Sequence, residues 1–225
     1  MCAILPLAPS RPAACNRESE DMSENQANLS PSVAPGAYFE EISTARLDLV
    51  PATPESLLIQ QRNSPASPLM RAELGALLNA EVTAEWPHEN WEPHVFDYLL
   101  NLYEQDAEAI GWCRYLLLRN PHGARTLIGS FGSGFPKPET GEAEIGYGIL
   151  PSYQRQGFAA EAVLAMLPWL QSRRQIGAFV AQTFPHLRGS IRVLEKCGFT
   201  LIGPGFEEGT ILFRRSPVES GLTPR

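Results

Sequence analysis

The sequence predicts an α+β fold in which a mixed, mainly antiparallel sheet is flanked by helices. The first observation is a run of three apolar segments joined by turn chemistry, which predicts a β-meander across residues 113–150. The second is a change of hydrophobic period after residue 150, from two residues to 3.6, which indicates that a βαβα unit follows the meander. Composition agrees, because 44% hydrophobic and 19% charged residues supply enough apolar side chain for a core.

The part before the meander is predicted to form one strand and three helices that cover the sheet. Leu47 and Leu49 alternate with polar residues, which predicts a strand over residues 45–50. Thr53 followed by Pro54 is typical of an N-cap and a first helical residue. Helices are expected over residues 54–62, over 69–79 after a Ser/Pro breaker, and from Pro93, where Phe96, Leu99, Leu100 and Tyr103 share one face.

The boundaries of the meander and of the elements after it are predicted from turn-forming residues, which are glycine, proline and asparagine. Asn-Pro-His-Gly at residues 120–123 is strong turn chemistry between two apolar runs, so they are predicted to pair as a hairpin. Pro168 removes one backbone N–H and is expected to kink or end its helix about one turn before Arg173. The expected strands are 113–119, 125–131, 142–150, 178–183, 200–202 and 210–214, and the expected helices are 157–171 and 190–196.

The chain of 225 residues is long enough for one domain with tails. Residues 1–36 are rich in Pro, Ser, Ala and Asn and lack a sustained period, which predicts a disordered N-terminal extension. We expect the folded domain over residues 37–216 and a flexible C-terminal tail over residues 217–225.

Charge and cysteine usage exclude several classes of partner. The 18 Lys and Arg against 25 Asp and Glu give a formal charge of −7, which opposes binding to nucleic acid or to an anionic membrane and favours an amine or other cationic ligand. The four cysteines are scattered without a CxxC pair, which indicates a reduced, cytoplasmic protein. The opening apolar residues are broken by Pro6 and Pro9 and have no basic residue before them, so neither a signal peptide nor an anchor is expected.

The most informative stretch is a glycine-containing loop between the 142–150 strand and the following helix. Backbone N–H groups at a helix start have no intrahelical acceptor and lie at the positive end of the helix dipole, so this junction suits a pyrophosphate. Gly157 allows close approach of the backbone, and Ala159 and Ala160 keep the first turn free of bulk. On spacing alone, an ordinary strand-to-helix turn fits equally well.

At this point the sequence resembles the GCN5-related N-acetyltransferases, and most closely their ribosomal-protein-acetyltransferase-like branch. Gln154-Arg-Gln-Gly-Phe-Ala159 matches that family's acetyl-CoA signature, R/Q-x-x-G-x-G/A, and Ser190-Ile-Arg-Val-Leu-Glu-Lys-Cys-Gly-Phe199 matches its closing helix and following strand. The resemblance covers residues 42–215. It implies a sheet that splays open after the Glu144–Leu150 strand, with acetyl-CoA as co-substrate in the gap. The cofactor-binding residues that it implies are Gly148, Ile149, Leu150, Gln154, Arg155, Gln156, Gly157, Phe158, Ala159, Ala160 and Ser190.

The reaction that the resemblance implies is direct attack of a primary amine on the thioester, within a ternary complex. It requires a base for the ammonium, polarisation of the carbonyl and an acid for the leaving thiolate. Glu144 is the expected base and Glu142 the alternate, although an ion-paired or solvent-facing strand carboxylate is the competing interpretation. A free backbone N–H between Gly148 and Leu150 is expected to polarise the carbonyl.

The expected acid departs from the family pattern. Many relatives carry a tyrosine on the closing helix, where this chain has Leu194. Ser190, one helical turn earlier, is the substitute that we expect, with helix capping as its alternative role. A second departure is Leu187, where relatives carry an asparagine that binds pantetheine; the expectation is either a lower affinity for the cofactor or compensation by Arg188.

The acceptor side is less specified. Trp86 and Trp112 are the candidate substrate residues, because aromatic rings beside acidic groups suit an amine, whereas core packing is the competing explanation. His88-Glu89 lacks the second histidine of a HExxH zinc motif, since Glu92 stands at that position, so no metal is expected.

The sequence therefore predicts an acetyl-CoA-dependent N-acetyltransferase whose acceptor is the N-terminus of a protein or a small-molecule amine. One alternative is a non-catalytic acyl-CoA-binding or regulatory module on the same fold. Another is an interaction unit, with a homodimer as the candidate assembly.

Overall fold

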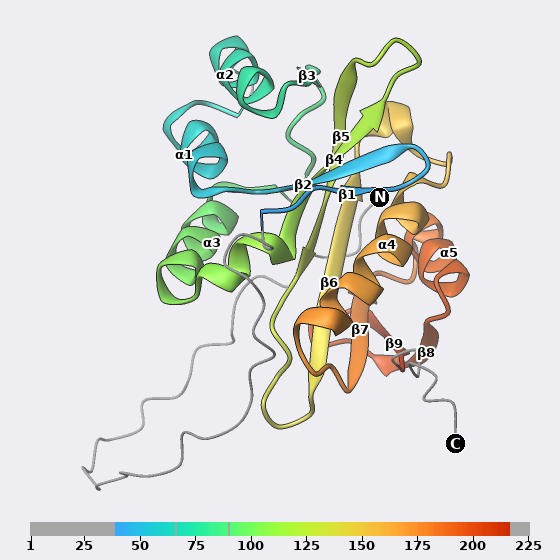
Figure 1. The fold of residues 1–225 in the computed structure, drawn as a ribbon. Helices are drawn as coiled ribbons and strands as arrows, with labels where there is room; N and C mark the ends of the chain where they lie inside the picture. Colours follow the sequence, from blue (N-terminus) through green and yellow to red (C-terminus); the bar gives the residue numbers. More distant parts are fainter. Residues whose placement is uncertain (1–38, 66, 90, 217–225) are drawn as a thin grey trace, which may run out of the picture.

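A computed structural model describes residues 39–65, 67–89 and 91–216 (Figure 1). All of them fall within the predicted domain of residues 37–216. The predicted N-terminal extension, 1–36, and the predicted tail, 217–225, lie outside the described residues. Within the described part, no helix combines the length and the apolar character needed to cross a membrane.

The elements follow the order that the periods predict, with small shifts at their ends. The strands are β1 (Ile42–Ser43), β2 (Leu47–Pro51), β3 (Glu81–Val82), β4 (Cys113–Arg119), β5 (Arg125–Ser133), β6 (Glu142–Ile149), β7 (Ala178–Thr183), β8 (Thr200–Pro204) and β9 (Ile211–Arg215). The helices are α1 (Pro54–Arg62), α2 (Pro68–Leu78), α3 (Pro93–Gln105), α4 (Phe158–Arg173) and α5 (Arg188–Lys196), with short 3-10 turns η1 (Ala107–Trp112) and η2 (Pro151–Tyr153).

The sheet is mixed and mainly antiparallel, which confirms the predicted fold class. Its strand order is β1-β2-β4-β5-β6-β7-β9-β8, and β3 pairs with β5 beside that path. Parallel pairing occurs between β6 and β7 and between β3 and β5. The predicted hairpin of β4 and β5 and the return strand β6 form the antiparallel centre.

Helices cover both faces of this sheet (Figure 1). One face, together with α4 and α5, encloses a core that contains Ile145, Phe158, Phe179 and Leu194. The opposite face, together with α1, α2 and α3, encloses a second core around Leu57, Leu74, Trp91 and Tyr115. The strands therefore have buried side chains on both sides, and β4 and β7 are buried along nearly their whole length.

The helix starts are fixed by local chemistry. The Thr53 hydroxyl accepts a hydrogen bond from Ser56 N at 3.3 Å and Pro54 opens α1, as predicted. The Ser67 hydroxyl caps α2 in the same way, and the helix begins at Pro68, one residue earlier than expected.

One prediction about a helix was wrong in part. Pro168 does not end α4, which continues to Arg173. The proline lies on the exposed face, so the Leu164 carbonyl that loses its N–H partner also faces solvent, where water can bind it.

Candidate active site

The sheet opens between β6 and β7. The two strands pair in parallel over only Glu142, Ala143 and Glu144 of β6, opposite residues 178–180 of β7. Beyond that point β6 continues to Ile149 while it pairs with β5 alone. One edge of β6 therefore faces a gap over residues 145–149, as the family resemblance implied.

The register shows which backbone amides face this gap. Leu150 N donates to Ile128 O at 2.8 Å, and Gly134 N donates to Glu144 O at 2.9 Å, so the even-numbered residues of β6 direct their backbone groups towards β5. By alternation, the amides of Tyr147 and Ile149 point to the side from which β7 has departed. Of the amides predicted to polarise a carbonyl, the Ile149 amide has the required direction; the Leu150 amide is already bonded.

A tight loop connects this strand to α4. Gly157 occupies the N-cap position with φ of 85°, a left-handed conformation that favours glycine, and Arg155 is also left-handed, with φ of 62°. The Gln154 side-chain amide donates to Ile149 O at 2.9 Å and closes the loop against the strand. The first amides of α4 are thereby presented to one side of the loop, as a phosphate site requires.

An open groove of about 660 Å³ follows the gap and this loop. It takes one wall from the loop and α4 and the other wall from α5. Arg155, Arg188, Arg192 and Lys196 line it, and all but Arg155 come from α5. Among the described residues, no Asp or Glu lines the groove.

Most of the residues predicted to bind the cofactor line this groove, and four do not. Ile149, Gln154, Arg155, Gly157, Phe158, Ala159 and Ala160 are in its lining. Gly148, Leu150 and Ser190 are not: Gly148 faces the other side of the sheet, Leu150 packs in the core beneath α1–α3, and Ser190 is 1% exposed behind the lining. Gln156 contributes its carbonyl oxygen to a bond with Arg46 instead.

Two hydroxyls meet at the inner end of the groove. The Tyr147 hydroxyl lies 3.3 Å from Ser190 Oγ and donates to Ser190 O at 3.2 Å. Tyr147 itself lines the groove, whereas Leu194, at the position where relatives carry tyrosine, is fully buried in the core. A tyrosine from β6 thus brings a phenol to the neighbourhood of Ser190. The sequence analysis did not identify Tyr147, because the contact is visible only when β6 and α5 are packed together in the fold.

The two candidate bases lie on the face of β6 opposite the groove and have different environments. Glu142 Oε1 accepts from Arg214 Nε at 2.9 Å, so it is ion-paired. Glu144 Oε1 accepts from Gln182 Nε2 at 3.0 Å, and the same amide nitrogen lies 3.4 Å from Glu207 Oε1. Burial raises the pKa of Glu144. The positive charge of Lys137 and the hydrogen bond from Gln182 act against this rise, whereas the negative charge of Glu207 adds to it. Glu144 is therefore the carboxylate better suited to take a proton.

The candidate substrate tryptophans lie on opposite faces of the sheet. Trp86 and Trp112 are each 1% exposed, the first in the core beneath α1–α3 and the second in the core beneath α4. Neither lines the groove. Trp86 Nε1 donates to Gln60 Oε1 at 2.9 Å, and Trp91 Nε1 donates to the same oxygen at 2.8 Å. Core packing accounts for both predicted residues.

His88, between those indoles, packs against the strand that forms the gap. Its ring occupies the space where a Gly148 side chain would begin, with Cε1 2.6 Å from that point. Its Nε2 lies 2.7 Å from Ser130 Oγ, and burial lowers the pKa of the ring to about 4, so the imidazole is neutral at physiological pH. No cluster of three His, Cys, Asp or Glu side chains suited to a metal occurs among the described residues.

The face of β5 and β6 that carries Glu144 is unusually bare. Register places Ser130 opposite Gly148 and Gly132 opposite Gly146, and the next position pairs Gly134 with Glu144. Four of these six residues are glycine, so their backbone forms a floor without side chains. A side chain added at Gly134 would meet nothing within 4 Å.

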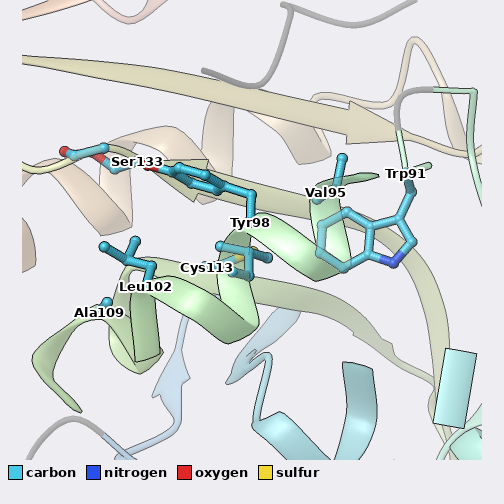
Figure 2. Close-up of a pocket in the computed structure, with 10 residues that line it drawn as sticks. Trp91, Val95, Tyr98, Leu102, Ala109, Cys113 and Ser133 are labelled. Carbon is cyan, nitrogen blue, oxygen red and sulfur yellow. The ribbon is translucent and has the colours of Figure 1, made fainter. Parts of the chain in front are cut away.

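A small cavity of about 20 Å³ lies over this floor (Figure 2). Figure 2 shows its aromatic and aliphatic wall, in which Trp91 stands beside Val95 and Tyr98 extends from α3 towards Ser133. Cys113 also lines it; burial raises the pKa of this thiol to about 12, so it is not a nucleophile. This cavity and the groove lie on opposite faces of the sheet, with the gap in β6 between them.

Comparisons with known proteins agree with this arrangement. The family model of the acetyltransferase (GNAT) domain matches residues 46–200. An uncharacterised N-acetyltransferase of Bacillus subtilis, YjdG, is 25% identical over 124 residues, which are 55% of this chain and 72% of that protein.

Solved structures show the same fold at low sequence identity. The ribosomal-protein-S5-alanine acetyltransferase of Vibrio fischeri superposes with a TM-score of 0.54 and 17% identity, covering 80% of this chain and 98% of its own. The microcin C7 self-immunity acetyltransferase MccE, solved with acetyl-CoA and AMP, superposes with a TM-score of 0.51 and 13% identity, covering 77% and 93%.

Proposed function

This chain belongs to the GNAT acetyltransferase family and is an acyltransferase, and on that premise we propose that it transfers the acetyl group of acetyl-CoA to a primary amine within a ternary complex. The acceptor class is an N-terminal or small-molecule amine. The groove receives the co-substrate, and the amine approaches from the opposite face of β6.

One observation carries the proposal. A chain with a formal charge of −7 lines a single groove with four cations and, among the described residues, with no carboxylate. That groove begins at the start of a helix with a glycine N-cap. Both features favour a ligand that carries several phosphates, because helix-start amides and unneutralised cations each attract them. Acetyl-CoA is such a ligand, and its pantetheine arm is long enough to continue along the groove to the gap.

The residues of the gap supply what the acyl transfer needs. The Ile149 amide donates to the thioester oxygen as it becomes an oxyanion. Glu144 takes one proton from the attacking ammonium, directly or through water, and its raised pKa favours this role. The new N–C bond forms on the free amine nitrogen, which becomes cationic in the tetrahedral intermediate and releases its second proton to water as the intermediate collapses.

Collapse of the tetrahedral intermediate breaks the C–S bond and leaves the electron pair on sulfur. The Tyr147 phenol, which lines the groove, donates a proton to this thiolate, and the buried Ser190 hydroxyl behind it is hydrogen-bonded to the phenol. The products are an N-acetylated amine and the free thiol of CoA. The phenol is then reprotonated from solvent along the open groove.

The acceptor is bounded by the floor of glycines and by the carboxylates of Glu144 and Glu207. A cationic amine suits two carboxylates, and the small cavity under α3 favours a compact group beside that amine. The similar enzyme from Vibrio fischeri is a ribosomal-protein-S5-alanine acetyltransferase. N-terminal peptides of ribosomal proteins are therefore the first acceptors to test.

The test has two stages. Isothermal titration is carried out with acetyl-CoA and with S-acetylpantetheine, which lacks the pyrophosphate. The difference between the two affinities measures how much the phosphates contribute to binding. Release of CoA thiol in the presence of a panel of peptides and small amines then measures transfer. Saturable binding of acetyl-CoA without thiol release in the presence of any amine would favour the alternative, a non-catalytic acyl-CoA-binding module. Absence of acetyl-CoA binding would refute the proposal.

A further inference from the structure

A cation from the first hairpin reaches the loop that begins α4. Arg46 lies in the turn between β1 and β2, more than a hundred residues before this loop, and Figure 1 shows that turn beside the start of α4. Its Nη1 donates to Gln156 O at 3.0 Å, and its guanidinium lies 4.3 Å from the centre of the Phe158 ring. Arg46 therefore contacts the loop on both sides of Gly157.

Glu161, in the first turn of α4, holds this guanidinium in place. Arg46 Nε donates to Glu161 Oε2 at 2.7 Å, and Nη2 lies 2.7 Å from the same oxygen. The other carboxylate oxygen accepts from the Arg46 backbone N at 2.8 Å and from Thr44 Oγ1 at 2.6 Å. The carboxylate is thus fully occupied, and the arginine has little rotational freedom left to lose on binding a ligand.

The fixed guanidinium still has donors to offer. It carries five N–H groups, and its bonds to Glu161 and Gln156 use one each of Nε, Nη1 and Nη2. Its side chain is 44% exposed. Two N–H groups, one on each terminal nitrogen, therefore remain for an incoming anion.

A second cation approaches Gly157 from the other wall of the groove. At the position where a Gly157 side chain would begin, Arg46 Nη2 is 3.6 Å away and Lys196 Nζ is 3.9 Å away. Lys196 comes from the last turn of α5, so the two charges belong to opposite ends of the chain. Any residue other than glycine would place atoms between them.

We propose that Arg46 and Lys196 form a two-sided clamp on the pyrophosphate of acetyl-CoA, with Arg46 as the half that Glu161 fixes in advance. The inference rests on the proposed function and adds to it a binding residue outside the signature loop.

The obvious objection is that Arg46 only fastens the hairpin to α4. Arg119 provides the matched control, because it holds the same turn through Thr44, Leu47 and Asp48 and is not among the atoms nearest to Gly157. It donates to Leu47 O at 3.0 Å and, through shorter bonds, to Thr44 O and Asp48. If anchoring of the turn were all that mattered, Arg119→Met and Arg46→Met would have the same effect on the ligand.

The experiment titrates the full-length wild type, Arg46→Met, Arg46→Lys, Lys196→Met and Arg119→Met with acetyl-CoA and with S-acetylpantetheine, at several salt concentrations. Arg46→Met is expected to weaken acetyl-CoA binding about tenfold or more, as loss of a charge-assisted bond to phosphate does, and to leave S-acetylpantetheine binding unchanged. Its acetyl-CoA affinity should also depend less on salt than that of the wild type. Arg46→Lys should recover part of the loss, and Lys196→Met should reproduce the salt effect.

The outcomes separate this inference from the proposal on which it rests. If the wild type binds acetyl-CoA and Arg46→Met binds it equally well, the clamp is refuted and the proposed function stands. Equal losses by Arg46→Met and Arg119→Met, for both ligands and at every salt concentration, would also refute the clamp, because they would show a purely structural role. Failure of the wild type to bind acetyl-CoA would overturn both.

Discussion

At the scale of single residues, the ionisation of Glu144 is the property that a measurement can isolate. Burial raises the pKa of this carboxyl above its ordinary value of 4.5 in the folded protein. In the folded state the proton is held to higher pH than in the unfolded chain, so the contribution of Glu144 to stability falls as pH rises from about 4.5 through the raised value. Glu144→Gln removes this titration. Its melting temperature relative to the wild type should therefore increase across that pH range.

The same substitution tests catalysis. The rate of thiol release by the wild type should rise with pH as Glu144 loses its proton, and Glu144→Gln should lose that limb of the profile together with most of the rate. Glu142→Gln, which breaks an ion pair with Arg214, is the control and should retain the limb. An unchanged pH profile in Glu144→Gln would rule out this base.

A substitution at Gly157 can act through backbone strain or by excluding the ligand. Gly123 separates the two effects, because it has the same backbone conformation but does not line the groove. The φ values of the two glycines are 85° and 83°, so a glutamate at either position costs about 1 kcal/mol or more of backbone strain. Only Gly157→Glu places a carboxylate beside Arg46 and Lys196, where it occupies the phosphate site. Titration should therefore show no acetyl-CoA binding by Gly157→Glu and normal binding by Gly123→Glu. Comparable affinities in the two variants would contradict the site.

The signature loop could be located from sequence because its chemistry is local: glycine, the helix start and the small residues after it are neighbours in the chain. Tyr147, Gln182 and Glu207 could not be found in this way. The role of each depends on a contact with a residue on another strand, helix or loop that is far away in the sequence, and no rule of sequence spacing predicts such a contact. Tyr147 did leave one signal, since it is the polar aromatic on the inward-facing side of β6.

At the scale of elements, α4 tolerates a proline because of where its missing hydrogen bond points. The sequence shows that Pro168 removes an N–H, but the structure is needed to show that Leu164, four residues earlier, is 44% exposed. Pro168→Ala should restore the bond and raise the free energy of unfolding by about 1–2 kcal/mol, measured by chemical denaturation. Ser172→Ala, on the exposed surface of the same helix, controls for helix propensity and should change stability by less.

The loop that carries His88 depends on one buried amide. Gln60 Oε1 accepts from Trp86 and Trp91, and its Nε2 donates to Tyr115 Oη at 2.7 Å. Gln60→Leu leaves two buried indole N–H groups without an acceptor, at a cost of about 2–5 kcal/mol. The expected result is a large fall in melting temperature. Gln61→Leu, the exposed neighbour, should change it little; equal effects would show that the buried network is not what matters.

The main strands and helices were predictable and the small elements were not, for a physical reason. Long apolar runs such as β4 and α3 carry their period within themselves. β1 and β3 have two residues each and exist only because β2 and β5 present them with free edges. Turn residues fixed the order of the strands along the chain, but the parallel contact of β6 with β7 required the crossover through α4.

At the scale of the whole molecule, the predicted extension stays a prediction because it lies outside the described residues. If residues 1–36 make no contribution to the core, a chain beginning at residue 37 should melt within about 2 °C of the full-length protein, a shift that corresponds to about 0.5–1 kcal/mol at most. Differential scanning calorimetry of both proteins checks this. A large drop would show that the extension packs against the domain, and acetyl-CoA titration would then show whether it reaches the groove.

The short junction of β6 with β7 has a consequence for the order in which the molecule comes apart. Three residue pairs join the two halves of the sheet, whereas β4 and β5 share seven. Amide protons along this junction should therefore exchange with solvent through openings that leave the rest of the sheet closed. If acetyl-CoA fills this gap as proposed, it should bond the free edge of β6 in place of the missing strand and slow amide exchange along the junction, so that the two halves of the sheet open together.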